Sequence, residues 1–259
     1  MSTTTRTLAL LALAGCTADL TPVSEAPPAD RALPGVTAPA AERGAATGGM
    51  VGTTPDQSWS GAASGAFGYG VSGVGDLNGD GYDDIAIGAN REGSYAGAMR
   101  VYMGSASGPS ATPDHTYTGG ASEQMGRIPV AGDFNADGFS DLVVGASFAN
   151  SRRGRAEIYM GSSAGLDSTP DQSLQGTTTS SYVGIGMEVG DFDADGHDDL
   201  LLGEYPRNRI QIYAGSPSGV ATSPSTTVSG PGGNSYFGQY NGIGDINADG
   251  YDDLVSVDY

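Results

Sequence analysis

The chain has 259 residues, with 30 acidic against 11 basic side chains and a formal net charge of −19. All the basic residues are Arg, and so acidic a chain argues against nucleic acid or anionic lipid as a partner, because both require a cationic face. No run reaches the roughly 18 apolar residues of a membrane span, and a single Cys excludes a disulfide framework.

Residues 1–15 are predicted to be a lipoprotein signal peptide. Arg6 is a minimal positive region, and a short apolar stretch follows it. The sequence Leu-Ala-Gly-Cys at 13–16 resembles a bacterial lipobox, which implies that Cys16 becomes the lipid-modified first residue of the mature protein. Thr17 follows instead of Asp, so the resemblance implies the outer membrane or cell surface of a Gram-negative bacterium. An ordinary signal peptide with an incidental thiol is the alternative.

Residues 16–50 are rich in Pro, Ala and Thr and contain no aromatic side chain. Such a segment cannot bury enough apolar surface to offset the entropy lost on ordering. We expect a flexible tether between the anchor and a folded domain at 51–259.

An acidic nine-residue segment occurs four times in that domain. These segments, numbered acidic loops 1 to 4, are "DLNGDGYDD" at 76–84, "DFNADGFSD" at 133–141, "DFDADGHDD" at 191–199 and "DINADGYDD" at 245–253. Their first residues are 57, 58 and 54 positions apart. A regular period of this size indicates a repeat architecture.

Each full unit contains four short strand-like segments. In the first unit they lie at 67–75, before the acidic loop, and then at 84–89, 98–104 and 115–119. No window has a sustained helical period, and frequent Gly disfavours helices. Four strands in such a unit indicate a propeller blade, so the predicted fold class is all-β. The expected blades cover 62–119, 120–176, 177–230 and, in part, 231–259.

The segment at 67–90 resembles the FG-GAP repeat of integrin α-chain propellers and their bacterial relatives. Phe67 and Gly68 supply the FG, while Gly88 and Ala89 supply most of the GAP. The later copies depart from this pattern; their FG positions are Met125 and Gly126, Val183 and Gly184, and Phe237 and Gly238. The resemblance covers about residues 54–259 and implies an integrin-like β-propeller.

The acidic loops are predicted calcium sites. Ca²⁺ takes six to eight oxygen ligands on a tight loop. Positions 1, 3, 5 and 9 offer side-chain oxygens, position 7 offers its carbonyl, and position 6 is always Gly, as a sharp turn requires. We expect about one Ca²⁺ per loop. The predicted ligands are Asp76, Asn78, Asp80, Tyr82, Asp84, Asp133, Asn135, Asp137, Phe139, Asp141, Asp191, Asp193, Asp195, His197, Asp199, Asp245, Asn247, Asp249, Tyr251 and Asp253.

Other interpretations of these loops fit less well. An EF-hand needs a bidentate Glu at position 12 and flanking helices, whereas position 12 here is Ile87, Val144, Leu202 or Ser256 in strand-like runs. Mg²⁺ is rarely surrounded by so many protein oxygens, and Zn²⁺ prefers His or Cys. A solvated acidic turn would explain one copy, but four copies with shared ligand positions favour metal.

Catalytic motifs are weak. "GSSAG" at 161–165 matches a nucleophile elbow, but Ala106 and Pro217 stand in the other repeats where Ser163 stands in this one. "GYGVSG" at 68–73 precedes an acidic loop that would repel phosphate. The only histidines are His115 and His197. Paired carboxylates for glycosidase chemistry remain conceivable, although calcium already explains each tight acidic cluster. We therefore expect no enzyme.

The predicted function is a calcium-binding, surface-anchored binding or adhesion module. The resemblance implies that ligands meet the end opposite the calcium loops, at 89–97, 146–155 and 204–209. These loops carry six of the eleven arginines, which favours an acidic extracellular protein or a glycan, with a solvated rim as the alternative. A domain of a carbohydrate-active protein and a calcium-dependent lectin are the other candidate functions. The six are Arg91, Arg152, Arg153, Arg155, Arg207 and Arg209.

The number of blades points to an incomplete propeller. Residues 54–259 hold about 3.6 units of 57 residues, whereas an integrin-like ring of seven needs roughly 400. We predict an open arc of three full blades and a partial one, with 54–61 an outer strand of the closing blade. A closed four-bladed ring, in which 54–61 reaches the last blade, is the alternative.

Overall fold

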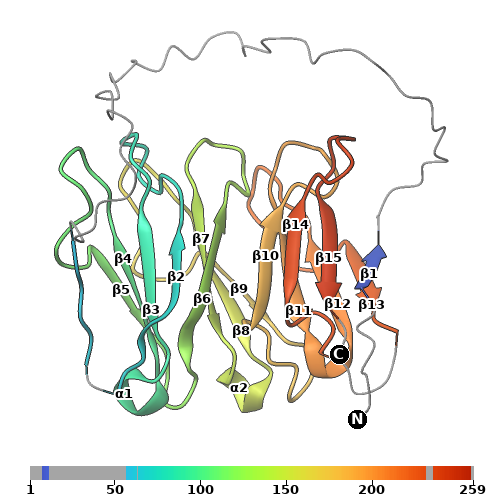
Figure 1. Ribbon diagram of the computed structural model, residues 1–259, viewed down its shortest axis with the longest axis horizontal. Helices are drawn as coiled ribbons and strands as arrows, with labels where there is room; N and C mark the ends of the chain where they lie inside the picture. Colours follow the sequence, from blue (N-terminus) through green and yellow to red (C-terminus); the bar gives the residue numbers. More distant parts are fainter. Residues whose placement is uncertain (1–7, 12–56, 63, 232–235, 258–259) are drawn as a thin grey trace, which may run out of the picture. The chain divides into compact units, whose positions relative to one another are not determined.

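The structure is a computed structural model that describes residues 8–11, 57–62, 64–231 and 236–257. Three antiparallel four-stranded sheets follow one another along the chain, each with its strands in sequence order (Figure 1). The predicted all-β fold with four-stranded blades is thereby confirmed. Blade 1 is β2 (Phe67–Gly73), β3 (Ile85–Ala89), β4 (Ala98–Tyr102) and β5 (His115–Thr118); blade 2 is β6 (Met125–Gly132), β7 (Asp141–Ala146), β8 (Arg155–Tyr159) and β9 (Gln172–Gln175); blade 3 is β10 (Gly186–Gly190), β11 (Asp199–Glu204), β12 (Arg209–Tyr213) and β13 (Thr226–Ser229).

A partial blade 4 follows, with β14 (Asn241–Gly244) paired to β15 (Asp253–Val257). The other edge of β15 pairs with β1 (Leu8–Leu11), from the segment predicted to be the apolar part of the signal peptide. β1 takes the place of a third strand: it aligns with β15 as β8 aligns with β7 in blade 2. Described residues 57–61 form no strand and do not pair with β15, so this part of the chain shows no ring closure.

Trp59 lies instead against blade 1. The Trp59 ring packs on Tyr102, with centroids 5.0 Å apart, and its Nε1 donates to the Ser110 carbonyl at 3.1 Å. Tyr117 of β5 repeats both contacts one blade later, on the ring of Tyr159 and the carbonyl of Asp167. Trp59 therefore occupies on blade 1 the place that Tyr117, from the fourth strand of blade 1, occupies on blade 2.

Short turns join the second and third strands of each full blade, at the end opposite the acidic loops (Figure 1). α1 and α2 contain residues with left-handed backbone angles, for example Ser94 and Asn150. No helix in the described part of the chain is long and apolar enough to cross a membrane. The turns are α1 (Glu92–Tyr95), α2 (Ala149–Arg152) and the 3-10 turn η1 (Tyr205–Arg207).

The core lies between the blades. Leu142 and Val144 of β7 pack into the cluster shared with blade 1, and Val143 between them packs into the cluster shared with blade 3. A strand buried on both faces needs a continuous apolar run instead of an alternating one. This explains the "LVV" of β7 and the "LLL" of β11, all of whose side chains are buried.

Glycines set how closely the blades approach. A Cβ on Gly88 of β3 would overlap the carbonyl of Gly126 in β6, and a Cβ on Gly145 would overlap the backbone of Gly184. The same relation joins Gly203 to Gly238. The Gly after each apolar run thus lies against the FG-position Gly of the next blade, which explains why these two positions recur.

Candidate metal centre

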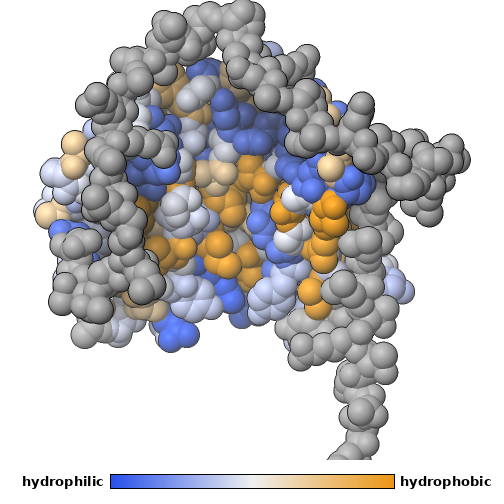
Figure 2. Space-filling model, turned by 45° about the horizontal axis from the view of Figure 1, so that its top comes forward, coloured by the Kyte–Doolittle hydropathy of each residue, from blue (hydrophilic) through white to orange (hydrophobic). Residues whose placement is uncertain are grey.

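The four acidic loops lie between the first and second strands of their blades. Figure 2 brings this end of the blades forward, and hydrophilic residues gather there. The position-1 carboxylate closes each loop on itself: Asp76 accepts hydrogen bonds from the N–H groups of Gly79, Asp80 and Gly81 at 2.7–3.1 Å. Asp133, Asp191 and Asp245 accept from positions 5 and 6 of their own loops in the same way.

The glycine at position 6 has the predicted unusual backbone angle. Its φ lies between +89° and +91° in all four loops, a region that side chains with a Cβ rarely adopt. The sharp turn therefore forms as the calcium-loop pattern requires. These glycines are Gly81, Gly138, Gly196 and Gly250.

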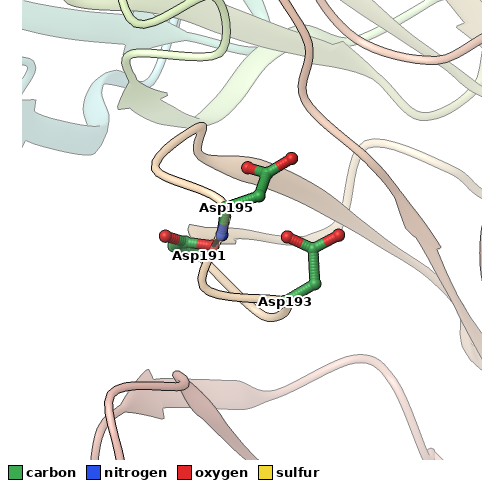
Figure 3. A group of neighbouring side chains, drawn as sticks. All are labelled: Asp191, Asp193 and Asp195. Atoms are coloured by element: carbon green, nitrogen blue, oxygen red, sulfur yellow. Dashed lines mark hydrogen bonds between the residues drawn. The ribbon is translucent and has the colours of Figure 1, made fainter.

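Positions 1, 3 and 5 converge. In loop 3, oxygens of Asp191, Asp193 and Asp195 all lie within 4.8 Å of one another (Figure 3). Partial burial, followed by the charges of its two neighbours, raises the pKa of Asp193. Three carboxylates at this spacing repel one another, and a hard divalent cation with oxygen ligands would relieve that repulsion. The donor set fits Ca²⁺.

The other three loops have Asn at position 3. Its Nδ2 donates to the position-5 carboxylate, at 3.1 Å from Asn78 to Asp80 and 2.8 Å from Asn135 to Asp137. Loop 4 has the same bond. A bound cation would instead be coordinated by the Oδ1 atom of this Asn, which already accepts a hydrogen bond from the position-5 N–H. The amide is thus a weaker, neutral member of the same donor set.

Position 9 is buried in loops 1 to 3 and holds each of these loops to its blade. Asp141, with no exposed surface, accepts from the N–H of Phe134 in its own loop at 2.9 Å and from Gly161, just after the third strand, at 2.8 Å. Asp84 and Asp199 make the equivalent pairs of bonds. Burial raises the pKa of Asp141 to about 7 and that of Asp199 to about 6, although the two N–H donors act in the opposite direction. Their role as metal ligands stays a prediction, as does that of Asp84 and Asp253.

Position 7 lies at the surface of its loop. Tyr82 and Tyr251 are exposed, and the position-7 N–H donates to the position-5 carboxylate in every loop, which brings the position-7 backbone to the carboxylate cluster. Carbonyl ligation by Tyr82, Phe139, His197 and Tyr251 stays a prediction.

Position 8, which is not among the predicted ligands, joins each of acidic loops 2 to 4 to the loop of the preceding blade. The Asp198 carboxylate accepts from the N–H of Asp133 in the preceding loop at 2.7 Å, while its own N–H donates to the Asp133 carbonyl at 3.1 Å. Asp252 makes both bonds to Asp191 of loop 3. Ser140 makes the backbone bond to Asp76. We call this two-way contact the loop clasp. The sequence contains one sign of this contact, because Gly precedes position 1 in every acidic loop. A Cβ on Gly132 would overlap the Asp198 side chain, so the clasp needs Gly there.

The strand residues at position 12 confirm that the loops are not EF-hands. Ile87, Val144 and Leu202 are buried in the second strands and carry no carboxylate. The structure also brings Ser163 and His115 together, around an open hollow of about 430 Å³ beside Asn78 and Asp80 of loop 1. No hydrogen bond joins Ser163 to His115 in the part of the chain that the structure describes.

Comparison with known proteins agrees with the repeat pattern. The FG-GAP repeat model matches residues 67–102, and the FG-GAP-like repeat model matches residues 133–202 and 191–256, together more than half of the chain.

Integrin α chains are among the similar curated proteins. Integrin alpha-5 of Xenopus laevis is 36% identical over 180 residues, covering 63% of this chain and 17% of the relative. Integrin alpha-8 of Homo sapiens is 36% identical over 169 residues, covering 58% and 16%. The chain therefore spans about a sixth of the length of these relatives.

Among solved structures, Bacillus licheniformis rhamnogalacturonan lyase PL11 superimposes with a TM-score of 0.51 at 16% identity, over 74% of this chain and 41% of the lyase. This likeness concerns the fold alone. With the repeated acidic loops, the FG and GA glycines between blades and the two matching models, the chain belongs to the FG-GAP repeat family of integrin α-like β-propellers.

Proposed function

We propose that the protein is a calcium-binding, surface-anchored module that binds another molecule without transforming it. The observation that carries the proposal is the fourfold loop geometry, whose third copy gathers three carboxylates within 4.8 Å. Similarity to integrin α chains supports a binding role. Position 1 orients the loop, positions 3 and 5 supply the remaining exposed oxygens, and bound Ca²⁺ would offset their mutual repulsion, so that metal binding adds to folding free energy.

Calorimetric titration of the demetallated full chain tests the calcium proposal. We expect uptake of about one Ca²⁺ per acidic loop. Asp193→Ala should remove one site, because it deletes a carboxylate from the loop 3 cluster. Asp167→Ala is the matched control, because this exposed Asp lies outside the acidic loops. No calcium uptake by the parent chain would refute the proposal.

The anchor proposal rests on Cys16, which lies outside the described residues. We expect the parent chain to partition with bacterial membranes and Cys16→Ser to remain unprocessed or be released. Thr17→Ser serves as a neighbouring control. Equal membrane association of the parent and Cys16→Ser would exclude lipid attachment at this position.

Catalysis on polysaccharides is the second candidate, and the lyase with a similar fold motivates its test. We expect no release of unsaturated or reducing ends from acidic polysaccharides incubated with the calcium-loaded chain. Sustained release that scales with protein concentration would replace the binding proposal with an enzymatic one.

A further inference from the structure

Charge is sorted between the two ends of the blades. Every described Asp lies in an acidic loop or in a loop between third and fourth strands, whereas the described arginines lie toward the end that carries α1, α2 and η1. Three of these arginines pair with Glu side chains: Arg100, Arg155 and Arg209. Five others have no carboxylate within salt-bridge distance among the described residues; they are Arg91, Arg127, Arg152, Arg153 and Arg207.

A row of aromatic rings crosses the same end. Phe148 meets Tyr182 edge to face at 5.4 Å, Tyr182 stacks on Tyr205 at 5.7 Å, and Tyr205 stacks on Tyr236 at 5.7 Å. These residues come from blade 2, blade 3 and the segment before β14, so three blades contribute to one aromatic row. Ring-on-ring packing fixes their orientation while the surface stays open: the Tyr236 side chain is 43% exposed.

Two of these five arginines lie against aromatic rings, and a third donates to a carbonyl near the row. The Arg152 guanidinium lies 5.8 Å from the centre of the Phe148 ring, and Arg127 lies 5.4 Å from that of Tyr69, which is 46% exposed. Arg207 donates to the carbonyl of Thr179 at 2.8 Å, just before Tyr182. Arg152 and Arg207 therefore lie beside the row, and the charge of Arg127 also acts on Tyr205, where it opposes the rise in the phenol pKa that burial causes.

This combination matches an acidic sugar chain. Aromatic faces pack against the C–H faces of sugar rings, phenol hydroxyls exchange hydrogen bonds with sugar hydroxyls, and a guanidinium binds a carboxylate through two parallel N–H bonds. A single-stranded nucleic acid also combines stacking bases with one charge per residue, so it is a competing ligand in the test below. An acidic peptide would satisfy the arginines but would leave the row of rings without a matching partner.

We infer that the aromatic row, with Arg127, Arg152 and Arg207, is the binding site for a linear uronate-containing oligosaccharide. The inference rests on the proposed binding function and specifies its ligand class. The site occupies the end opposite the acidic loops, so Ca²⁺ supports it through the fold and not by contact with the sugar.

Calorimetry of the full chain in Ca²⁺ tests this with hexasaccharides of glucuronate, galacturonate and mannuronate, beside cellohexaose, a poly-glutamate peptide and a thymidine dodecamer. We expect binding of at least one uronate hexamer and no binding of the neutral hexamer. Arg127→Gln and Tyr236→Ala should each weaken it about tenfold or more. Asp167→Asn changes one charge in the exposed loop between β8 and β9, away from this end, and should leave affinity unchanged.

Calcium uptake measured on every variant separates this inference from the proposed function. Loss of sugar binding with calcium uptake intact supports the site. Failure of the calcium-loaded parent to bind any uronate hexamer would overturn the inference, as would equal binding of cellohexaose. Tighter binding of the peptide or of the thymidine dodecamer would assign the surface to an acidic protein or a nucleic acid instead.

Discussion

At the scale of single residues, the acidic loops divide their carboxylates among three tasks, and loop 3 shows all of them. Position 1 accepts N–H groups of its own loop, position 9 ties the loop to the end of the third strand, and position 8 reaches the loop of the preceding blade. Within the described part of the chain, the side chains at positions 3 and 5 form hydrogen bonds only with each other and with backbone N–H groups of their own loop. A carboxylate-rich loop is therefore compatible with folding before metal arrives, because most of its charge is already met by backbone N–H groups.

The loop clasp should be measurable as stability. Asp198→Ala leaves the N–H of Asp133 without its acceptor, so we expect a loss of about 1–2 kcal/mol in the free energy of unfolding at saturating Ca²⁺. Asp198→Asn keeps an amide oxygen for that bond and should retain most of the stability. Urea unfolding followed by circular dichroism measures both.

Asp83 supplies the matched control for this experiment. It occupies position 8 of loop 1, where no described blade precedes it, and its side chain is exposed. Asp83→Ala should change stability little. Equal losses for Asp83→Ala and Asp198→Ala would show that acidity in the loop matters and the clasp does not.

At the scale of elements, close packing between neighbouring blades depends on backbone touching backbone. The second strand of one blade meets the FG position of the next through Gly88 and Gly126, Gly145 and Gly184, and Gly203 and Gly238. A side chain at these points would push two sheets apart along their shared apolar core.

Gly145→Ala should therefore lower the free energy of unfolding by about 1–3 kcal/mol, because its Cβ overlaps the backbone of Gly184. Gly73→Ala, in β2, is the control, since a Cβ there meets no atom within 4 Å. The denaturation midpoints should separate the two variants at unchanged m-values. A midpoint for Gly145→Ala that matches Gly73→Ala would contradict backbone contact between the blades.

Elements were more predictable than their contacts. The period of the acidic loops and the apolar runs after them located the strands of all three blades, because local patterning and turn chemistry determine those. The loop clasp, the aromatic row and the cover by Trp59 join residues of different blades. Nothing in the sequence near Phe148 or Tyr236 indicates that the two belong to one row, since that depends on how successive blades are placed in space.

At the scale of the whole molecule, the two faces of the repeat array differ in chemistry. One end concentrates Asp and the predicted metal sites, and the other concentrates Arg and the row of aromatic rings that contact one another. This separation follows from the order of the strands within each blade. The loops after the first strands all lie at one end and repeat the acidic motif. The turns after the second strands lie at the other end, and their sequences differ from blade to blade. If the predicted Ca²⁺ sites bind metal, they would stiffen the end opposite the proposed sugar site.

The last blade provides a prediction about association. Its β15 pairs with β14 on one edge and with β1 on the other. If residues 1–15 are removed as predicted, the β1 edge of β15 loses its partner and exposes a row of unpaired N–H and C=O groups, which promotes pairing with another strand. Sedimentation velocity in Ca²⁺ should then show more self-association for a chain that begins at Cys16 than for the full chain.

A charged substitution on the edge of β15 that pairs with β1 tests whether this edge causes the self-association. Val255 lies in β15 opposite Leu10 of β1, and Val255→Lys in the shortened chain should restore the monomer because a lysine on an open edge disfavours strand addition. Ser229→Lys, on the exposed strand β13 of blade 3, adds the same charge to a different edge and should not restore it. Two results would contradict this prediction: a shortened chain that does not self-associate, or an equal reduction of self-association by the two lysine substitutions. Either would show that β1 does not protect the β15 edge from association.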